Sequence, residues 1–164
     1  MKFKRADTTP DLMALAKGLG GGFPVGACLA TDRAAQFMTA GTHGSTFGGN
    51  PLAMAAANAV MDVLMAPGFM DGVVQTADKL WAKLEALVAK HDAVFECVRG
   101  KGLMIGLKCK KTNTDVVAKV LANGMLTVPA GDNVLRLLPP LIIGDAEIDA
   151  AIAILDKSAA ELAS

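Results

Sequence analysis

The most regular pattern of hydrophobic and polar positions lies in the second half of the chain. From Met70 to Lys90, apolar residues recur every third or fourth position and charged residues lie opposite them, which predicts one amphipathic helix. We expect the apolar stripe of this helix to face a core, with Trp81 largely buried. The stripe consists of Val73, Ala77, Leu80, Trp81, Leu84, Leu87 and Val88.

Shorter apolar runs follow this helix and alternate with polar, glycine-containing breaks. They predict strands at 93–98, 103–109, 125–128 and 134–138. They also predict turns at 99–102 and 130–133, a helix at 114–123, and a last helix that Asp145 caps. Strands and helices in this mixed order predict an α/β or α+β fold. Residues 69–164 therefore form a small α+β domain in this interpretation.

The first half has a different pattern, with loops and short apolar runs. The runs 11–16 and 25–31 are bounded by glycine and proline, which predicts two short buried strands. A glycine-rich polar loop at 40–50 precedes Pro51, a residue suited to the first position of a helix. The helix that begins there is so rich in alanine, methionine and valine that we expect it to be almost entirely buried.

The composition of the chain is unusually apolar for its length of 164 residues. Hydrophobic residues make up 52% without glycine, and there are 17 glycines besides. Soluble domains average about 45–50% apolar residues with glycine included. Such a chain is expected to cover its apolar surface with a large subunit interface or with a further segment.

Charge and cysteine usage exclude several classes of function. The formal net charge of +0 argues against a nucleic-acid binder or a polybasic membrane binder. No window reaches the ~20 apolar residues of a membrane span, and the N-terminus lacks the apolar core of a signal peptide. Three widely spaced cysteines fit reduced thiols, so we expect a cytoplasmic protein. Only two histidines are present, which makes a catalytic zinc site unexpected.

Lys17 is the first candidate for chemistry. It is the only charged residue within Leu12–Ala30, where every other residue is apolar or glycine. A buried lysine loses proton affinity and can attack a carbonyl carbon to form a Schiff base. Alternatively, the side chain extends from a turn to water with its stem on apolar surface. The local pattern leaves both interpretations open.

A second candidate is the loop Gly41–Asn50, which carries two adjacent hydroxyls, Ser45 and Thr46. Hydroxyls and free N–H groups just before a helix suit an anion, and phosphate in particular. The alternative is that these side chains only cap turns or the helix. His43, in the same loop, receives no chemical role.

Arg136 is the third candidate, because it interrupts an apolar strand. It shares one face of the predicted strand with Val134 and Leu138. A guanidinium stays charged, so in apolar surroundings it needs a carboxylate or phosphate partner. The alternative is an edge strand whose arginine points to water. Arg99 falls in a predicted turn and is interpreted as structural.

Four longer motifs occur in order, and together they are far more specific than any single residue. Their sequence closely resembles the class III, fold-type I pyridoxal-phosphate aminotransferases, and most nearly the acetylornithine/ornithine aminotransferase group. The resemblance runs from about Thr9 to the C-terminus. The motifs are Pro10–Ala27, Thr42–Ala53, Val98–Leu107 and Gly131–Leu141.

This resemblance implies a role for each candidate residue. Lys17 matches the lysine that holds pyridoxal 5'-phosphate as a Schiff base and moves a proton at the substrate α-carbon. Thr46 matches a hydroxyl that binds the cofactor phosphate of the neighbouring subunit, and Ser45 lies beside it. Arg136 matches the arginine that binds the substrate α-carboxylate, a contact suited to bidentate geometry. The substrates implied are an amino acid and a 2-oxo acid, here 2-oxoglutarate, in arginine biosynthesis.

The resemblance also implies a division of the chain and a gap. Residues 1–68 match the end of the large cofactor-binding domain and 69–164 match the whole small domain, as in the C-terminal portion of the transferase fold. The family's phosphate loop, its ring-stacking aromatic residue and the aspartate that pairs with the pyridinium nitrogen have no counterpart here.

Two functions therefore remain open. One is an aminotransferase that acts as a homodimer or together with an N-terminal portion. The other is a non-catalytic relative that serves as an interaction or vestigial domain.

Overall fold

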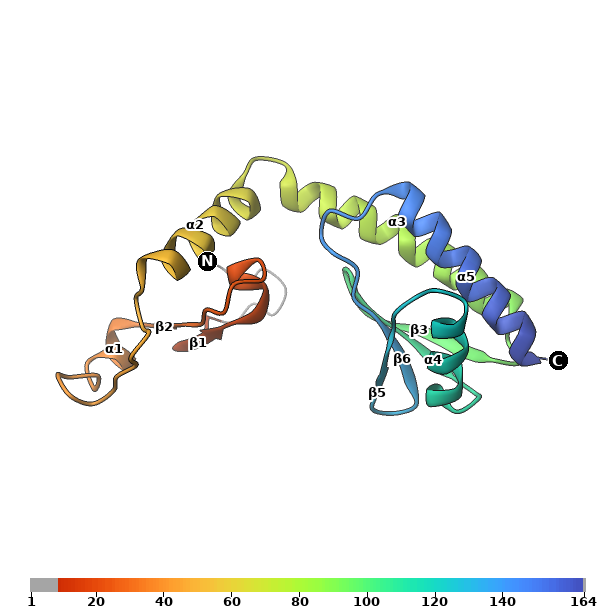
Figure 1. Cartoon of the computed structure of the whole chain (residues 1–164), viewed down its shortest axis with the longest axis horizontal. Helices are drawn as coiled ribbons and strands as arrows, with labels where there is room; N and C mark the ends of the chain where they lie inside the picture. The colour runs from red at the N-terminus through yellow and green to blue at the C-terminus, as the bar shows by residue number, and fades with distance from the viewer. Residues whose placement is uncertain (1–8, 164) are drawn as a thin grey trace. The chain divides into compact units, whose positions relative to one another are not determined.

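The computed structural model describes residues 9–163 (Figure 1). The chain divides into two compact units, Met1–Pro67 and Gly68–Ser164. The mixed α/β architecture expected from the sequence is confirmed.

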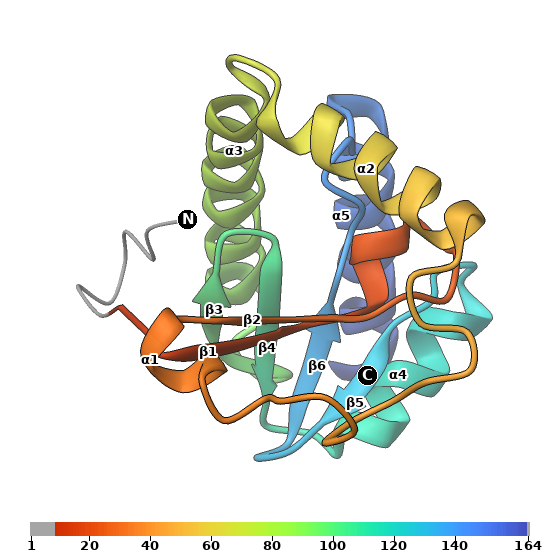
Figure 2. The same ribbon diagram turned by 90° about the vertical axis from the view of Figure 1, so that its left-hand side faces the viewer.

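The second unit is built on a four-stranded antiparallel sheet in the order β3-β4-β6-β5. Alternate residues of its two central strands, such as Ile105, Leu107 and Leu135, are buried on the side that faces the helices. Figure 2 shows the helices of this unit behind its sheet. The strands are β3 (Phe95–Lys101), β4 (Met104–Cys109), β5 (Val128–Ala130) and β6 (Val134–Leu137).

Three helices cover that face of the sheet: α3 (Phe69–Lys90), α4 (Asn113–Ala122) and α5 (Asp145–Ala163). The periodic pattern located α3 to within one residue, and its stripe enters the core as expected. Trp81 is partly buried at the edge of this core, where its indole N–H donates to the carbonyl oxygen of Gly102 at 2.8 Å.

Three ion pairs join α3 to α5 with a constant spacing in the sequence. Each links a lysine of α3 to an aspartate 66 positions later, so the two helices run side by side in the same direction (Figure 1). The N–O distances are 2.6 to 3.0 Å, and exposed pairs of this kind each add little stability. Because the spacing is the same in all three pairs, a single alignment of α3 against α5 accommodates all of them. The pairs are Lys79–Asp145, Lys83–Asp149 and Lys90–Asp156.

Three local expectations for this unit were wrong. The expected strand at 125–128 begins only at Val128, because Gly124 ends α4 at φ +97 and three residues are needed to return to the sheet. The expected turn at 99–102 is mostly strand, and the connection is Gly102–Leu103. Asp145 lies inside the first turn of α5, where the Glu147 carboxylate accepts a hydrogen bond from the Gly144 N–H.

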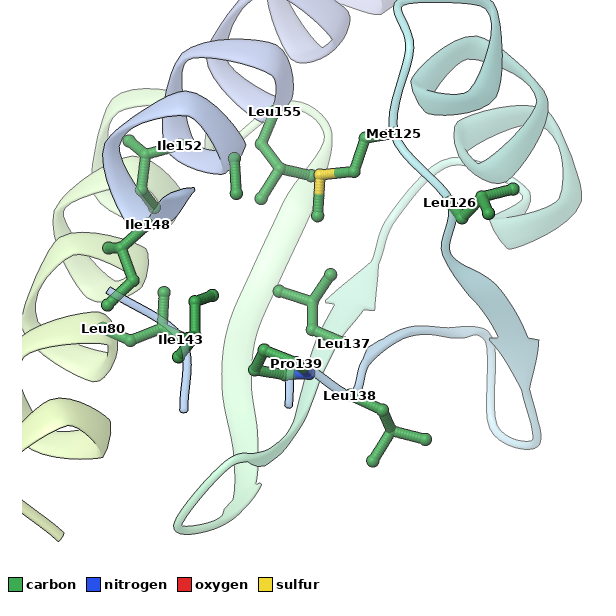
Figure 3. Close-up of a pocket in the computed structure, with 11 residues that line it drawn as sticks. Leu80, Met125, Leu126, Leu137, Leu138, Pro139, Ile143, Ile148, Ile152 and Leu155 are labelled. Atoms are coloured by element: carbon green, nitrogen blue, oxygen red, sulfur yellow. The ribbon is translucent and has the colours of Figure 1, made fainter. Parts of the chain in front are cut away.

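A small apolar pocket opens between α3, α5 and the end of β6 (Figure 3). Its volume is about 110 Å³. Leu80, Ile148 and Leu155 approach it from the helices, and Leu137 and Pro139 approach from the sheet. The core of the second unit is therefore open at this edge.

The first unit contains a two-stranded antiparallel hairpin, β1 (Leu12–Leu15) and β2 (Ala27–Ala30). The 3-10 turn η1 (Lys17–Gly20) follows β1, and the short α1 (Asp32–Ala35) follows β2. The long helix of this unit is α2 (Pro51–Met65), which begins at Pro51 as expected.

The expectation that α2 is almost entirely buried was wrong for this chain. Only Ala53 of α2 is buried, because no described element of this unit covers the other sides of the helix. Large apolar side chains are exposed throughout this unit. They are Leu12, Leu29, Phe37, Met38, Phe47, Leu52, Met54, Val63 and Met65.

Among the described residues, no single helix is both long and apolar enough to cross a membrane. The one bent pair that passes this test, on length and composition only, is α2 with α3.

Candidate functional site

Lys17 stands where β1 ends and η1 begins, and its backbone is strained. Its φ is +54, in the left-handed region that costs a non-glycine residue about 1–2 kcal/mol. Gly21 and Gly22, which follow in the chain, also have positive φ. Strain of this kind gathers at functional sites. The observation supports a special role for Lys17.

The glycines beside Lys17 have a packing role. A Cβ on Gly20 would lie 2.7 Å from Val25, and a Cβ on Gly21 would lie 2.8 Å from Val60 of α2. Only glycine allows η1 to approach these side chains so closely. The glycine run therefore fixes η1, and with it Lys17, against the start of β2 and against α2.

The Lys17 side chain is exposed in this chain. Of the two interpretations that the local pattern left open, the described residues form the one in which the lysine reaches water. The physical reason is that the neighbouring apolar residues on β1 and β2 are themselves largely uncovered, so they exclude no water from the amine.

Ser45 and Thr46 lie in an exposed loop before α2. Neither hydroxyl caps the helix, because Asn50 does so. Its Oδ1 accepts from the Ala53 N–H at 2.9 Å, while its Nδ2 donates to the carbonyl oxygen of Phe47 at 2.8 Å. The hydroxyls are thus left available for a ligand, and Ser45 lines a pocket of about 200 Å³ beside Gly26 and the start of α2.

No hydrogen bond or ion pair among residues 9–163 joins Lys17 to Ser45 or Thr46. The pocket beside Ser45 is lined by residues 24–26, 45, 47–50, 53 and 54, and Lys17 is absent from it. The amine and the hydroxyls therefore do not form one site within this unit. That Thr46 serves a neighbouring subunit stays a prediction.

Arg136 lies in β6 on the face of the sheet turned away from the core, here called the second face. Its neighbours Leu135 and Leu137 point into the core, so Arg136 must point the other way. Its Nε atom is buried and has no hydrogen-bond partner, and the side chain forms no ion pair with any described residue. A buried guanidinium nitrogen without a partner is costly unless a ligand supplies an acceptor.

The sequence interpretation missed a group of charges close to Arg136. The carboxylate of Asp132 binds both Arg99 of β3 and Lys108 of β4, the latter at 2.7 Å. The hydrogen bond from Lys108, and then that from Arg99, hold the pKa of Asp132 below its usual value. Arg99 is therefore paired within the sheet and does not lie in a turn. No sequence signal joins three residues so far apart in the chain.

An asparagine pair fixes the turn that carries Asp132. Asp132 and Asn133 both have positive φ, +57 and +52, which asparagine and aspartate tolerate better than most residues. Asn133 donates to the carbonyl oxygens of Cys109 and Lys111, and accepts from the Asn113 N–H at 2.8 Å. The turn, and hence the start of β6, is held from two sides.

The donor set can be tested against a cofactor that carries an aldehyde and a phosphate. Lys17 offers a primary amine on strained backbone, and the loop before α2 offers two hydroxyls that no helix cap uses. These groups match an aldehyde and a phosphate, respectively. The amine and the hydroxyls therefore have the chemistry that this cofactor requires. They form only part of a site that would enclose it.

Comparison with known proteins identifies the class. The family model for the class-III aminotransferases matches residues 2–158, so the chain belongs to the class III aminotransferase family. This family depends on pyridoxal phosphate. Within it, the chain falls in the acetylornithine/ornithine aminotransferase group.

Two bacterial relatives illustrate the match. An acetylornithine aminotransferase of Mesorhizobium japonicum is 57% identical over 143 residues, which is 87% of this chain and 36% of that protein. An acetylornithine aminotransferase of Bradyrhizobium diazoefficiens is 52% identical over 161 residues, or 98% of this chain and 40% of that protein. The chain thus spans about 40% of the length of these relatives.

Solved structures agree with the sequence match. The acetylornithine aminotransferase of Elizabethkingia anophelis gives a TM-score of 0.85 at 34% identity, over 96% of this chain and 41% of that one. An ornithine aminotransferase of Plasmodium yoelii gives 0.86 at 29% identity, over 98% of this chain and 43% of that one. The fold of each relative therefore extends well beyond the part seen here.

Proposed function

We propose that this chain carries part of the active site of a pyridoxal-phosphate aminotransferase, which moves an amino group between an ornithine-type amine and 2-oxoglutarate. The unpartnered, buried Nε of Arg136 carries the proposal, because it is a hydrogen-bond donor that lacks the acceptor a carboxylate would supply. Family membership and the strained backbone of Lys17 support it. Action in arginine biosynthesis and in the cytoplasm belongs to the same proposal.

Lys17 has two tasks in this proposal. Its Nζ would hold the cofactor at the aldehyde group, and it would move a proton at the α-carbon of the substrate. When bound, pyridoxal phosphate supplies the electron sink that makes this proton removable. The exposed position of Lys17 lets the cofactor approach, and the packed glycines keep η1 in place.

Ser45 and Thr46 hold the phosphate in this proposal, each donating a hydroxyl hydrogen bond. The resemblance assigns the phosphate that they bind to the site of a neighbouring subunit. The proposed assembly is therefore a homodimer, or an association with an N-terminal portion like that of the longer relatives.

Arg136 orients the substrate by its α-carboxylate. The fork of the guanidinium matches two carboxylate oxygens, and the buried Nε gains the acceptor that it lacks. No step of bond breaking falls to this residue. Its loss would therefore weaken substrate binding without removing the covalent link to Lys17.

A second candidate function is that of a non-catalytic interaction domain. The exposed apolar side chains of the first unit and the exposed Lys17 favour it for the chain by itself. A lysine in water has no pocket that would concentrate the cofactor.

Borohydride trapping separates the two candidates. The chain is incubated with pyridoxal phosphate, reduced with borohydride, and mapped by peptide mass spectrometry. The proposal predicts a pyridoxyl label concentrated on Lys17, lost in Lys17→Ala and kept in the exposed control Lys157→Ala. A label spread evenly over the lysines supports the interaction domain, and a specific label on another lysine rules out the assignment to Lys17.

A further inference from the structure

Two rows of residues cross the second face of the sheet. In the first row, Arg99, Gly106, Arg136 and Val128 lie directly opposite one another on successive strands. Neighbouring strands are about 4.8 Å apart, so the Cα atoms of Arg99 and Arg136 are separated by about 10 Å. Gly106, which has no side chain, lies between these two arginines.

The second row adds another cation. Lys108 lies opposite Val134 on β6, next to the first row. Its side chain is only 16% exposed, and its Nζ donates to the carbonyl oxygen and to the carboxylate of Asp132, at 2.5 and 2.7 Å. Arg99 donates to the other carboxylate oxygen of Asp132. Arg99 and Lys108, the two cations next to Arg136, thus both form ion pairs with the Asp132 carboxylate.

This arrangement divides the three cations into two kinds. Arg99 and Lys108 share Asp132, whereas Arg136 forms no ion pair with any described residue. Without Asp132, a ligand with two carboxylates could bind Arg136 with one of them and Arg99 or Lys108 with the other. Such a ligand would lie across the sheet with both ends fixed.

We propose that Asp132 is a specificity-determining residue: by holding Arg99 and Lys108, it restricts the second face of the sheet to one ligand carboxylate, bound at Arg136. This inference rests on the proposed role of Arg136. It adds a role for the Asp132 carboxylate. A dicarboxylate, such as the 2-oxo acid substrate, can bind Arg136 with one carboxylate, but Asp132 prevents its other carboxylate from binding Arg99.

The test is an NMR titration of the whole nitrogen-15-labelled chain with two probes of similar length, glutarate with two carboxylates and butyrate with one. The Nε–Hε signals of Arg99 and Arg136, assigned with R99K and R136K, report where each probe binds. Wild-type chain is expected to show shifts at Arg136 with both probes and none at Arg99.

Asp132→Asn is the informative variant, because asparagine tolerates the positive φ of this turn. It is expected to raise the ratio of glutarate to butyrate affinity by about tenfold, since the second carboxylate then binds intramolecularly. Glutarate should then shift Arg99 as well, and added salt should reduce the gain. Asp132→Glu is expected to restore the wild-type ratio, and the exposed control Asp92→Asn should leave it unchanged.

The outcomes separate this inference from the proposed function. If butyrate shifts Arg136 but Asp132→Asn leaves the affinity ratio unchanged, the role of Asp132 is wrong and that of Arg136 stands. If neither probe shifts Arg136 in wild type or in Asp132→Asn, both are wrong. If glutarate already shifts Arg99 in wild type, Asp132 excludes nothing.

Discussion

Three glycines of the second unit differ in their surroundings, so a glycine-to-alanine substitution can be compared in three environments. Gly72 lies in α3 with open space around it. Gly102 lies in the β3–β4 turn at φ +57, also with open space. Gly100 lies inside β3 at φ +123, where a Cβ would meet the backbone carbonyl oxygen of Met104. The structure therefore predicts three different effects on stability.

Gly100→Ala is expected to be the most damaging of the three. The backbone conformation alone costs an alanine about 1–3 kcal/mol. Because the clashing atom belongs to the backbone of β4, the strand pair must also separate locally, at about 0.5–1.5 kcal/mol for each hydrogen bond lost. Loss of one or two bonds brings the total to about 3 kcal/mol, which lowers Tm by about 12–24 °C in a unit of this size.

The other two substitutions calibrate this value. Gly102→Ala has strain without a clash and is expected to cost about 1–2 kcal/mol. Gly72→Ala has neither, and removes the conformational entropy of a helical glycine. It is expected to stabilise the unit by about 0.5–1 kcal/mol.

The assay is urea unfolding of the whole chain, followed by circular dichroism and by Trp81 fluorescence, since Trp81 lies in the second unit. The predicted order of unfolding free energies is Gly72→Ala, wild type, Gly102→Ala, Gly100→Ala, from highest to lowest. Equal losses for Gly100→Ala and Gly102→Ala would refute the reasoning, because the clash with Met104 would then contribute nothing.

Three further predictions concern the same unit. Thr127→Val should raise the unfolding free energy by about 1 kcal/mol in urea titrations, because the Thr127 Oγ1 is buried and has no hydrogen-bond partner among the described residues. Ala151→Leu should fill part of the apolar pocket and add about 1–2 kcal/mol by the same measurement, at about 0.8 kcal/mol per buried methylene. Lys90 and His91 lower the pKa of Asp156 below its usual 3.8, so its stabilising effect is present above that value and lost as pH falls through the lower folded pKa. The Tm difference between wild type and Asp156→Asn should therefore shrink in strong acid, and a difference independent of pH would contradict this.

The helix α3 was predictable because its signal is local. Twenty-two residues with one hydrophobic period leave little choice of structure. Gly100 shows the opposite case. Its neighbour Gly102 and the surrounding polar residues predicted a turn, yet the strand continues through Gly100. Pairing with β4 decides this, and such pairing depends on residues that no local window contains.

The candidate site divides in the same way. Lys17, Ser45, Thr46 and Arg136 were proposed from the sequence, because each is chemically unusual among its neighbours. The Asp132 cluster was not, since its meaning depends on β3, β4 and the β5–β6 turn meeting in one sheet. The exposure of Lys17 and of α2 could not be predicted from the sequence either, because burial depends on which other elements cover a surface.

The buried apolar residues are unevenly distributed between the two units. This distribution affects carboxylate binding at Arg136 and cofactor binding at Lys17 differently. All buried apolar residues of the described chain except Ala53 lie in the second unit. Arg136 therefore stands on a unit with its own core, whereas Lys17 stands on one whose apolar side chains are largely exposed. The proposed carboxylate binding at Arg136 is therefore expected to need only the fold of the second unit. Cofactor binding at Lys17 is proposed on a unit with little apolar cover, so partners that cover this unit should strengthen it more than they strengthen carboxylate binding at Arg136.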